Sequence, residues 1–322
     1  MSGWNDSNPH FLQGDSGRNV GVKGSSSPSF VCMPKRNSSV VGREFGNGVR
    51  DAIEQSGMTQ RGIAELLDWQ EAKVSDAVNG KGGVSELDLV RLLSYCRVPH
   101  QEVERMVALY RESREKGWLQ FIDDGNPRPL QSLIDQERLA SKITTWSPTY
   151  VSGLFQIAAY IRALLESSAV IKPPAFDDLI RLKIDRQVIF NRSREFLFYI
   201  HENALRLQVG GPDVMQAQLL HLLAMMVRPY ITVRVVPAAI GAHAGASGPF
   251  IKLEYAKYES AVWIEALRTG LFLDDKKSVE DYDNVLKWLD KHALDPEESR
   301  KLISSLEAQG GVSLVDLAQE QL

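Results

Sequence analysis

Apolar residues recur at intervals of three and four along residues 42–110, and this spacing predicts five short helices in succession. The first predicted helix spans residues 42–56, with an inward stripe made of Phe45, Val49, Ala52 and Ile53. The fourth begins at Ser85, whose spacing to Asp88 is that of a capping box, and turns inward Leu89, Leu92, Leu93 and Cys96. The fifth follows Pro99 and turns inward Val103, Met106, Val107 and Tyr110. Five helices in about 75 residues make a compact helical domain.

The second and third predicted helices, between Thr59 and Lys81, have the layout of a DNA-reading helix-turn-helix. Thr59 is a good N-cap, and Asp68 suits the turn because aspartate tolerates the left-handed conformation that a sharp turn often needs. The third helix is expected from about Gln70 to Val78, with a stop at Asn79-Gly80. The inward residues of the two helices are Ile63, Ala64, Leu67, Val74, Ala77 and Val78.

If the third helix lies in a major groove, its outward residues meet base edges. We predict DNA contacts from eight residues, which are Thr59, Gln60, Arg61, Gln70, Glu71, Lys73, Ser75 and Lys81. Between Gly42 and Arg97, seven basic residues stand against nine acidic ones, a net charge of −2. Because phosphate neutralisation drives affinity for DNA, one copy of this domain is expected to bind weakly, and a homodimer compensates by doubling the contacts.

From residue 130 onward, short β-prone runs alternate with helical patterns. The runs 231–236, 249–255, 261–266 and 271–273 predict an antiparallel meander, extended by 143–146 and 196–201. Helices are expected at about 130–141, 155–168, 176–192, 212–226, 279–293 and 295–306; the first of them uses Leu133, Ile134 and Leu139 as apolar contacts. The predicted fold class is α+β, an all-α helix-turn-helix domain followed by an antiparallel-rich sheet flanked by helices.

The length of 322 residues suggests two domains. Residues 1–41, rich in Gly, Ser, Asn and Pro, are predicted to form a disordered tail. Its basic residues, Arg18, Lys23, Lys35 and Arg36, outnumber its acidic ones. A basic arm that touches DNA is therefore an alternative to a solvated tail. We assign residues 42–116 to the helix-turn-helix domain, 117–129 to a connector, 130–309 to the α+β receptor domain and 310–322 to a C-terminal tail.

Composition narrows the functional classes. With 43% hydrophobic residues, 24% charged residues and a net charge of −4, the chain is an ordinary globular protein and not a polybasic nucleic-acid coat. Cys32 and Cys96 lie far apart, so neither a disulfide framework nor a zinc site is expected, and a reducing cytoplasm is the natural setting. The longest apolar run is too short for a membrane span, and the N-terminus lacks the apolar core of a signal peptide.

The motif TQxxIAxxLxWxxxKVSxxxNGK, within residues 42–111, resembles the Xre-type, repressor-like helix-turn-helix domains. Gly62 lies inside the first helix of the motif, and Asp68 occupies the turn position where that family usually has Gly. Asp76 and Val78 stand where relatives commonly carry Arg and Glu. These departures leave open a rival reading, in which the motif has degenerated into a protein-binding module.

Residues 143–165 resemble the signature of a C-terminal domain found in actinobacterial WhiJ-like regulators, where it follows an Xre-type helix-turn-helix. The matching positions are Trp146, Pro148, Val151, Gly153, Leu154, Gln156, Tyr160, Arg162 and Ala163. Further matches lie within 181–187, 198–205, 210–219 and 233–250. The resemblance implies an actinobacterial transcriptional regulator and, because WhiJ-like proteins are often encoded beside small acidic proteins, a small acidic partner.

In the C-terminal domain we predict eight ligand- or partner-binding residues, which are Trp146, Gln156, Tyr160, Arg162, Arg186, Glu202, His243 and Glu265. The tryptophans and the Gln156/Tyr160 pair suit a pocket for a small apolar ligand, although core packing of Trp146, Trp263 and Trp288 is the favoured reading. Glu202 and Glu265 each end a β-run; buried acids need partners, which Arg162 or Arg186 would supply.

Three functions compete for this sequence. The favoured one is a transcriptional regulator that binds double-stranded DNA as a homodimer and receives a signal through its α+β domain. The alternative is an antitoxin-like, partner-binding protein. An enzyme is the least favoured, because the sequence has no Ser nucleophile elbow, HExxH motif, Walker loop or GxGxxG motif. No catalytic residue, metal or cofactor is therefore expected.

Overall fold

The computed structural model describes residues 38–113, 117–121 and 128–310. The predicted N-terminal tail lies almost wholly outside these residues, as do Cys32, residues 122–127 of the predicted connector, and residues 311–322. None of the helices within the described ranges combines the length and the apolar character needed to cross a membrane.

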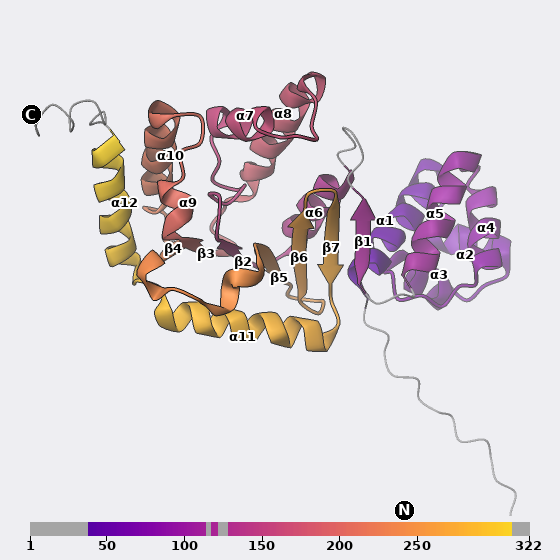
Figure 1. Ribbon diagram of the computed structural model, residues 1–322. Coiled ribbons are helices and arrows are strands. Elements are labelled where there is room, and N and C mark those ends of the chain that lie inside the picture. The colour runs from indigo at the N-terminus through magenta and orange to yellow at the C-terminus, as the bar shows by residue number, and fades with distance from the viewer. Residues whose placement is uncertain (1–37, 114–116, 122–127, 311–322) are drawn as a thin grey trace, which may run out of the picture. The chain divides into compact units, whose positions relative to one another are not determined.

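The five predicted helices of the first domain are confirmed. They are α1 (Val40–Gln55), α2 (Gln60–Leu67), α3 (Glu71–Val78), α4 (Glu86–Tyr95) and α5 (His100–Glu112) (Figure 1). The predicted tail boundary at residue 41 is wrong. Ser39 caps α1 by accepting the Gly42 N–H, and Val40 and Val41 are buried in its first turn.

The second domain contains a seven-stranded sheet in the order β1-β7-β6-β5-β2-β3-β4. Its strands are β1 (Trp118–Phe121), β2 (Lys142–Ser147), β3 (Glu195–His201), β4 (Ile231–Val236), β5 (Phe250–Glu254), β6 (Ala261–Ala266) and β7 (Thr269–Leu273). The pairs β2–β3 and β3–β4 are parallel and the remaining pairs are antiparallel, which confirms the α+β class with a mostly antiparallel sheet.

Two predictions about the sheet are wrong. β4 does not continue the meander of β5, β6 and β7, because β2 and β3 lie between β4 and β5. A parallel β3–β4 pair becomes possible because helices between these strands carry the chain back across the sheet. The predicted connector also contains a strand: β1 pairs with β7, and Trp118 is buried and stacked on Phe272 at 5.9 Å.

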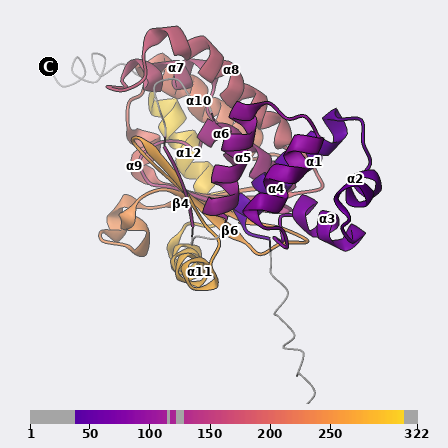
Figure 2. The ribbon, with the colours of Figure 1, turned by 90° about the vertical axis from the view of Figure 1, so that its right-hand side faces the viewer.

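Seven further helices flank the sheet within the described residues. They are α6 (Arg128–Leu139), α7 (Ala158–Glu166), α8 (Phe176–Arg186), α9 (Glu202–Arg206), α10 (Pro212–Met225), α11 (Lys276–His292) and α12 (Pro296–Gly310). Short 3₁₀ turns occupy Pro173–Ala175, Gln187–Ile189, Ala238–Ile240 and Ala244–Ser247. Figures 1 and 2 show α11 on the face of the sheet opposite α7, α8 and α10.

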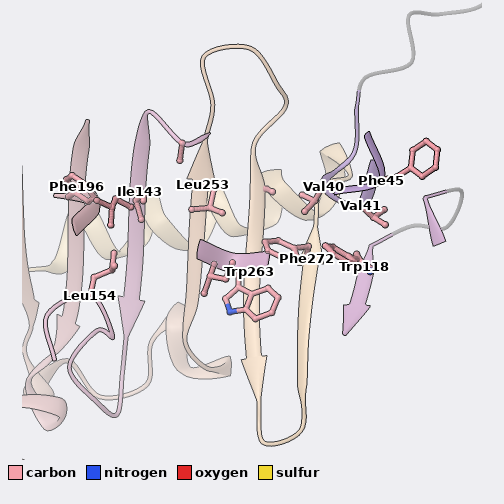
Figure 3. Packing of buried hydrophobic residues seen from close by; sticks show 14 of the residues in the cluster. Val40, Val41, Phe45, Trp118, Ile143, Leu154, Phe196, Leu253, Trp263 and Phe272 are labelled. Atoms are coloured by element: carbon pink, nitrogen blue, oxygen red, sulfur yellow. The ribbon is translucent and has the colours of Figure 1, made fainter. Parts of the chain in front are cut away.

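Alternation along the strands supplies both faces of this sheet with apolar residues. On the face beneath α6, α7 and α10, a row runs across the sheet through Phe196, Ile143, Leu253, Trp263, Phe272 and Trp118 (Figure 3). On the other face, Trp146, Tyr199, Phe250 and Val262 pack with Leu289 of α11. The predicted core packing of Trp146 and Trp263 is therefore confirmed, and Trp288 is partly buried against the second cluster.

Candidate nucleic-acid interface and ligand pocket

The C-terminal end of α3 is fixed by close backbone packing against α1. A Cβ added to Gly46 would lie 2.6 Å from both the backbone nitrogen of Gly80 and the carbonyl oxygen of Val78. Gly80 itself has a φ of +67°, which favours glycine. Arg50 Nη2 donates a hydrogen bond of 3.1 Å to the Val78 carbonyl. The position of α3 is therefore set by glycines and an arginine outside the predicted DNA-contacting residues.

The turn before α3 has the geometry predicted from the sequence. Asp68 adopts the left-handed conformation, with φ 55° and ψ 48°, and Thr59 Oγ1 caps α2 by accepting the Gly62 N–H at 3.0 Å. Gln70 is the N-cap residue of α3 and makes no side-chain capping bond. Because Gln70 and Glu71 are both exposed, α3 presents its N-terminal end and the Gln70 amide to the solvent.

Lys73 makes a structural contact that the sequence pattern did not reveal. Its Nζ donates a 2.8 Å hydrogen bond to Asp88 Oδ2 in the first turn of α4, and it lies 4.1 Å from the centre of the Trp69 ring. The hydrogen bond from Lys73 lowers the pKa of Asp88 below its usual value. DNA contact by Lys73 stays a prediction, since its ammonium already links α3 to α4.

The other predicted DNA-contacting residues differ in exposure. Thr59, Gln60, Arg61 and Lys81 are exposed, whereas Ser75 is half-buried and accepts the Asn79 side-chain N–H at 3.3 Å. Arg61 Nε lies 3.1 Å from Glu65 Oε1 and 3.6 Å from Glu71 Oε1, so two exposed carboxylates flank its guanidinium. The sequence prediction omitted two exposed residues of α3, Ala72 and Asp76. The helical period that turned Val74, Ala77 and Val78 inward would have identified them.

In the second domain, the buried arginine is paired with an acid that we did not predict. Arg186 donates from Nε to Glu137 Oε2 at 2.7 Å and from Nη2 to Glu137 Oε1 at 2.6 Å. Burial opposes the charge on Arg186, but the Glu137 carboxylate and the more distant Glu265 raise its pKa above the usual value. The expectation that Arg162 or Arg186 neutralises a buried Glu202 or Glu265 is wrong, because Glu202 pairs with Arg206 and Glu265 is exposed.

The pattern assigned to α6 also needs correction. Leu133 and Ile134 are buried as predicted, but Leu139 is 45% exposed. Gln136 and Glu137 are completely buried in its place. The hydrophobic pattern does not predict this burial, because a polar side chain can be buried when it has a hydrogen-bond partner. Here Gln136 pairs with Arg43 and Glu137 pairs with Arg186.

A pocket of about 470 Å³ lies between the 148–156 segment, α6, α7, α8 and the ends of β2, β5 and β6. It brings together four of the eight predicted ligand- or partner-binding residues, namely Trp146, Gln156, Arg186 and Glu265. The sequence prediction missed several others that line it, among them Leu133, Thr145 and Lys183. These residues come from segments far apart in the chain, so no local pattern groups them.

The remaining four predicted residues lie elsewhere. Tyr160 is fully buried and its hydroxyl accepts the Val151 N–H at 3.3 Å, and burial raises its pKa to about 12. It does not share a helical face with Gln156, because α7 begins only at Ala158. Arg162 is exposed and pairs with Asp177 at 2.6 Å.

Glu202 and His243 have structural contacts. Glu202 Oε2 accepts the Ala238 N–H at 2.9 Å, while its Oε1 accepts from Arg206 Nε at 2.7 Å. His243 stacks on His201 at 5.3 Å and meets the edge of Trp146 at 5.4 Å. Within the described residues, no group of His, Cys, Asp and Glu side chains is arranged to hold a metal ion.

Comparison with known families divides the chain into the same two parts. The family described as a helix-turn-helix domain matches residues 44–106, which cover most of α1 to α5. The family described as a domain of unknown function (DUF5753) matches residues 130–305, which hold the pocket and every strand except β1. No curated protein matches the chain. The helix-turn-helix match supports a DNA-binding regulator.

Proposed function

The chain belongs to the DUF5753 family, and we propose that it is a sequence-specific DNA-binding transcriptional regulator whose C-terminal domain senses a small ligand. One observation carries the DNA-binding part. The N-terminal end of α3 is exposed, its Gln70 amide takes no part in capping, and the helix is fixed at its other end by Arg50 and Gly46.

This geometry suits the reading of bases in a major groove. Recognition helices of this motif contact base edges with their N-terminal residues, and a glutamine amide pairs with adenine through two hydrogen bonds. Thr59, Gln60 and Arg61 lie at the exposed start of α2, where contacts with phosphates position such a domain on the duplex. Gln70 is therefore assigned to base reading and the start of α2 to backbone contacts.

The acidic residues near α3 affect the oligomeric state that the proposal requires for DNA binding. Glu65, Glu71 and Asp76 are exposed close to the proposed reading surface, and Arg61 is paired with two of these acids. A single domain then gains little from phosphate neutralisation. The proposal therefore includes a homodimer that places two copies of α3 on successive half-sites, in the cytoplasm where the DNA lies.

The ligand-sensing part rests on the pocket in the α+β domain. Its volume of about 470 Å³ is in the range of small-molecule sites, and its lining mixes apolar side chains with a few polar ones. No catalytic step is assigned to the chain. The antitoxin-like alternative with a degenerate helix-turn-helix is not favoured, since the Thr59 cap and the Asp68 turn keep regular geometry.

A gel-shift titration tests the DNA-binding part. The full-length protein is mixed with DNA from upstream of its own gene and, separately, with shuffled DNA of equal length and composition. We expect a shift that prefers the upstream DNA and weakens steeply as salt concentration rises, because phosphate contacts release counterions. Equal affinity for both DNAs, or no shift at low salt, would contradict sequence-specific binding.

A further inference from the structure

The pocket in the α+β domain contains three buried polar atoms without a hydrogen-bond partner among the described residues. They are Thr145 Oγ1, Gln156 Oε1 and Trp263 Nε1. The three residues are only 2%, 5% and 2% exposed. Buried polar groups are nearly always hydrogen-bonded, because leaving one unpaired carries a desolvation penalty. Three such atoms around one pocket indicate a site built to receive polar atoms of a ligand.

The chemistry of two of these atoms is fixed. Gln156 Nε2 donates to the Val151 carbonyl at 2.8 Å, and a flipped amide would place two oxygens against each other, so Oε1 is the unpartnered atom and can act only as an acceptor. Trp263 Nε1 can act only as a donor. A matching ligand therefore carries one N–H or O–H group and one acceptor oxygen.

Two charged side chains of the lining, Lys183 and Glu265, make no ion pair with a described residue. Arg186 is neutralised by Glu137, although its Nη1 makes no hydrogen bond with a described residue. Lys183 is half-buried, and no described carboxylate lies within ion-pair distance of it. Burial lowers the pKa of Lys183, while Glu265 partly offsets that effect. A ligand with a single anionic group would compensate Lys183, whereas a dianion would meet the Glu265 carboxylate that also lines the pocket.

Apolar side chains form another part of the lining. Leu133, Leu164, Ile251 and the ring of Trp263 lie around the space between the polar groups. The pocket also lies beside the end of β2, the strand that pairs antiparallel with β5 and parallel with β3. In sheets with α/β crossovers, ligands bind beyond the carboxyl ends of strands where the chain path changes direction.

We propose that this pocket binds a small amphipathic monocarboxylate that also carries an N–H or O–H donor. The carboxylate pairs with Lys183 and with Arg186 Nη1, the donor binds Gln156 Oε1, and an uncharged ligand oxygen accepts from Trp263 Nε1 and Thr145 Oγ1. The apolar body of the ligand packs against Leu133, Leu164 and Ile251. This inference rests on the proposed sensory role of the same domain, to which it gives a class of ligand.

Calorimetric titration of the full-length protein tests the inference with two probes, N-acetyl-L-leucine and 4-hydroxyphenylacetate. The uncharged controls are N-acetyl-L-leucinamide and 4-hydroxyphenylacetamide. We expect at least one acid to bind about tenfold or more tightly than its amide, the margin that a charged hydrogen bond supplies. Binding of neither acid at millimolar concentration, or equal binding of acid and amide, overturns the proposal.

Variants test whether the acid binds in the pocket or at another surface of the protein. Lys183→Gln should weaken binding of the acid by about ten- to a hundredfold, since it removes the charge and keeps a polar, unbranched side chain. Lys277→Gln, at an exposed lysine outside the pocket lining, is the matched control and should bind like the wild type. Unchanged affinity in Lys183→Gln, or equal loss in Lys277→Gln, contradicts the assignment.

If Lys183→Gln does not fold, Trp263→Phe replaces it as the decisive variant. It keeps an aromatic ring beside Phe272 and removes only the donor, so a several-fold loss of affinity is expected and no loss contradicts the role of Nε1. Failure of the sensory proposal is recognised separately. If the acid binds the pocket but does not alter the gel shift, the ligand assignment stands and the proposed sensory role of the domain is contradicted.

Discussion

Glu137 of α6 and Arg186 of α8 form an ion pair shielded from water, with side chains only 1% and 5% exposed. Two parallel hydrogen bonds join the guanidinium to the carboxylate, in the geometry that gives such pairs their specificity. The pair ties together two helices that line the ligand pocket and directs Arg186 Nη1 away from Glu137. Its contribution is therefore to both the stability and the shape of the site.

Breaking this pair should destabilise the domain strongly. Glu137→Gln leaves a buried guanidinium without its counter-charge, and we expect a loss of about 3–5 kcal/mol in the free energy of unfolding, measured with urea. Asp135→Asn, on the same helix but in the exposed pair with Arg138, is the control and should cost at most about 1 kcal/mol. Similar small losses in both variants would show that water reaches Arg186 after all.

Gly46 should be irreplaceable where α1 meets the end of α3. Gly46→Ala places a methyl group 2.6 Å from backbone atoms of Val78 and Gly80, so α3 must move and binding to DNA should fall along with stability. Gly62→Ala is the matched control, because the nearest atom to its Cβ is Thr59 Oγ1 at 3.3 Å. Its expected effect is a gain of up to about 1 kcal/mol from better helix propensity. DNA affinity that stays unchanged in Gly46→Ala would separate α3 from recognition.

Substitutions of Gln70 and Lys73 should affect different properties, DNA sequence preference for Gln70 and stability for Lys73. Gln70→Ala removes an exposed amide without a capping role, so stability should be retained while the preference for upstream over shuffled DNA falls. Lys73→Gln removes the ammonium that joins α3 to Asp88 and Trp69, so the domain should melt at a lower temperature. Thermal melts and gel shifts on both variants measure the difference, and unchanged sequence preference in Gln70→Ala would argue against base reading.

Stability should depend on pH through His201. Burial and the neighbouring His243 lower the pKa of His201, so the unfolded chain binds this proton more readily than the folded one. The free energy of unfolding should therefore fall as pH falls below about 6.5. His201 Nδ1 also accepts the Asn203 N–H at 3.1 Å, a cap that protonation of this nitrogen would break. His201→Asn keeps a side chain that can cap the helix but does not titrate. The difference between the free energies of unfolding at pH 7.5 and pH 5.5, measured with urea, should therefore be smaller in this variant than in the wild type.

Affinity for the proposed monocarboxylate should fall as pH rises. Only the protonated Lys183 attracts the ligand, and burial places its pKa below the usual 10.5, so the loss of affinity begins at lower pH than for an exposed lysine. Lys183→Arg keeps its charge across this range and should bind the acid with little dependence on pH. Titrations at several pH values measure both; the same pH dependence in the two proteins would exclude Lys183 as the ionising partner.

The sequence by itself determined the local features of this protein. Thr59, Asp68 and the Ser85–Asp88 capping box specify their helix boundaries through bonds within a few residues, so the helix-turn-helix was predicted nearly residue by residue. Most strands and helices of the second domain also followed from the hydrophobic period and from turn residues. Exposure of Gln70 and Glu71 was predicted in the same way, because the helical period assigns each residue a face.

The tertiary structure alone decided which distant residues meet. Strand periodicity does not say that β2 and β3 separate β4 from β5, because strand order depends on chain crossovers and not on local preference. Glu137 and Lys183 look like surface residues in the sequence, since the cost of burying a charge depends on neighbours that lie far along the chain. The bond from Lys73 to Asp88 likewise joins two helices, and the helical period of α3 does not specify it. Backbone preferences act over one helical turn, whereas charge compensation and cavity shape act through space, and only the folded chain specifies them.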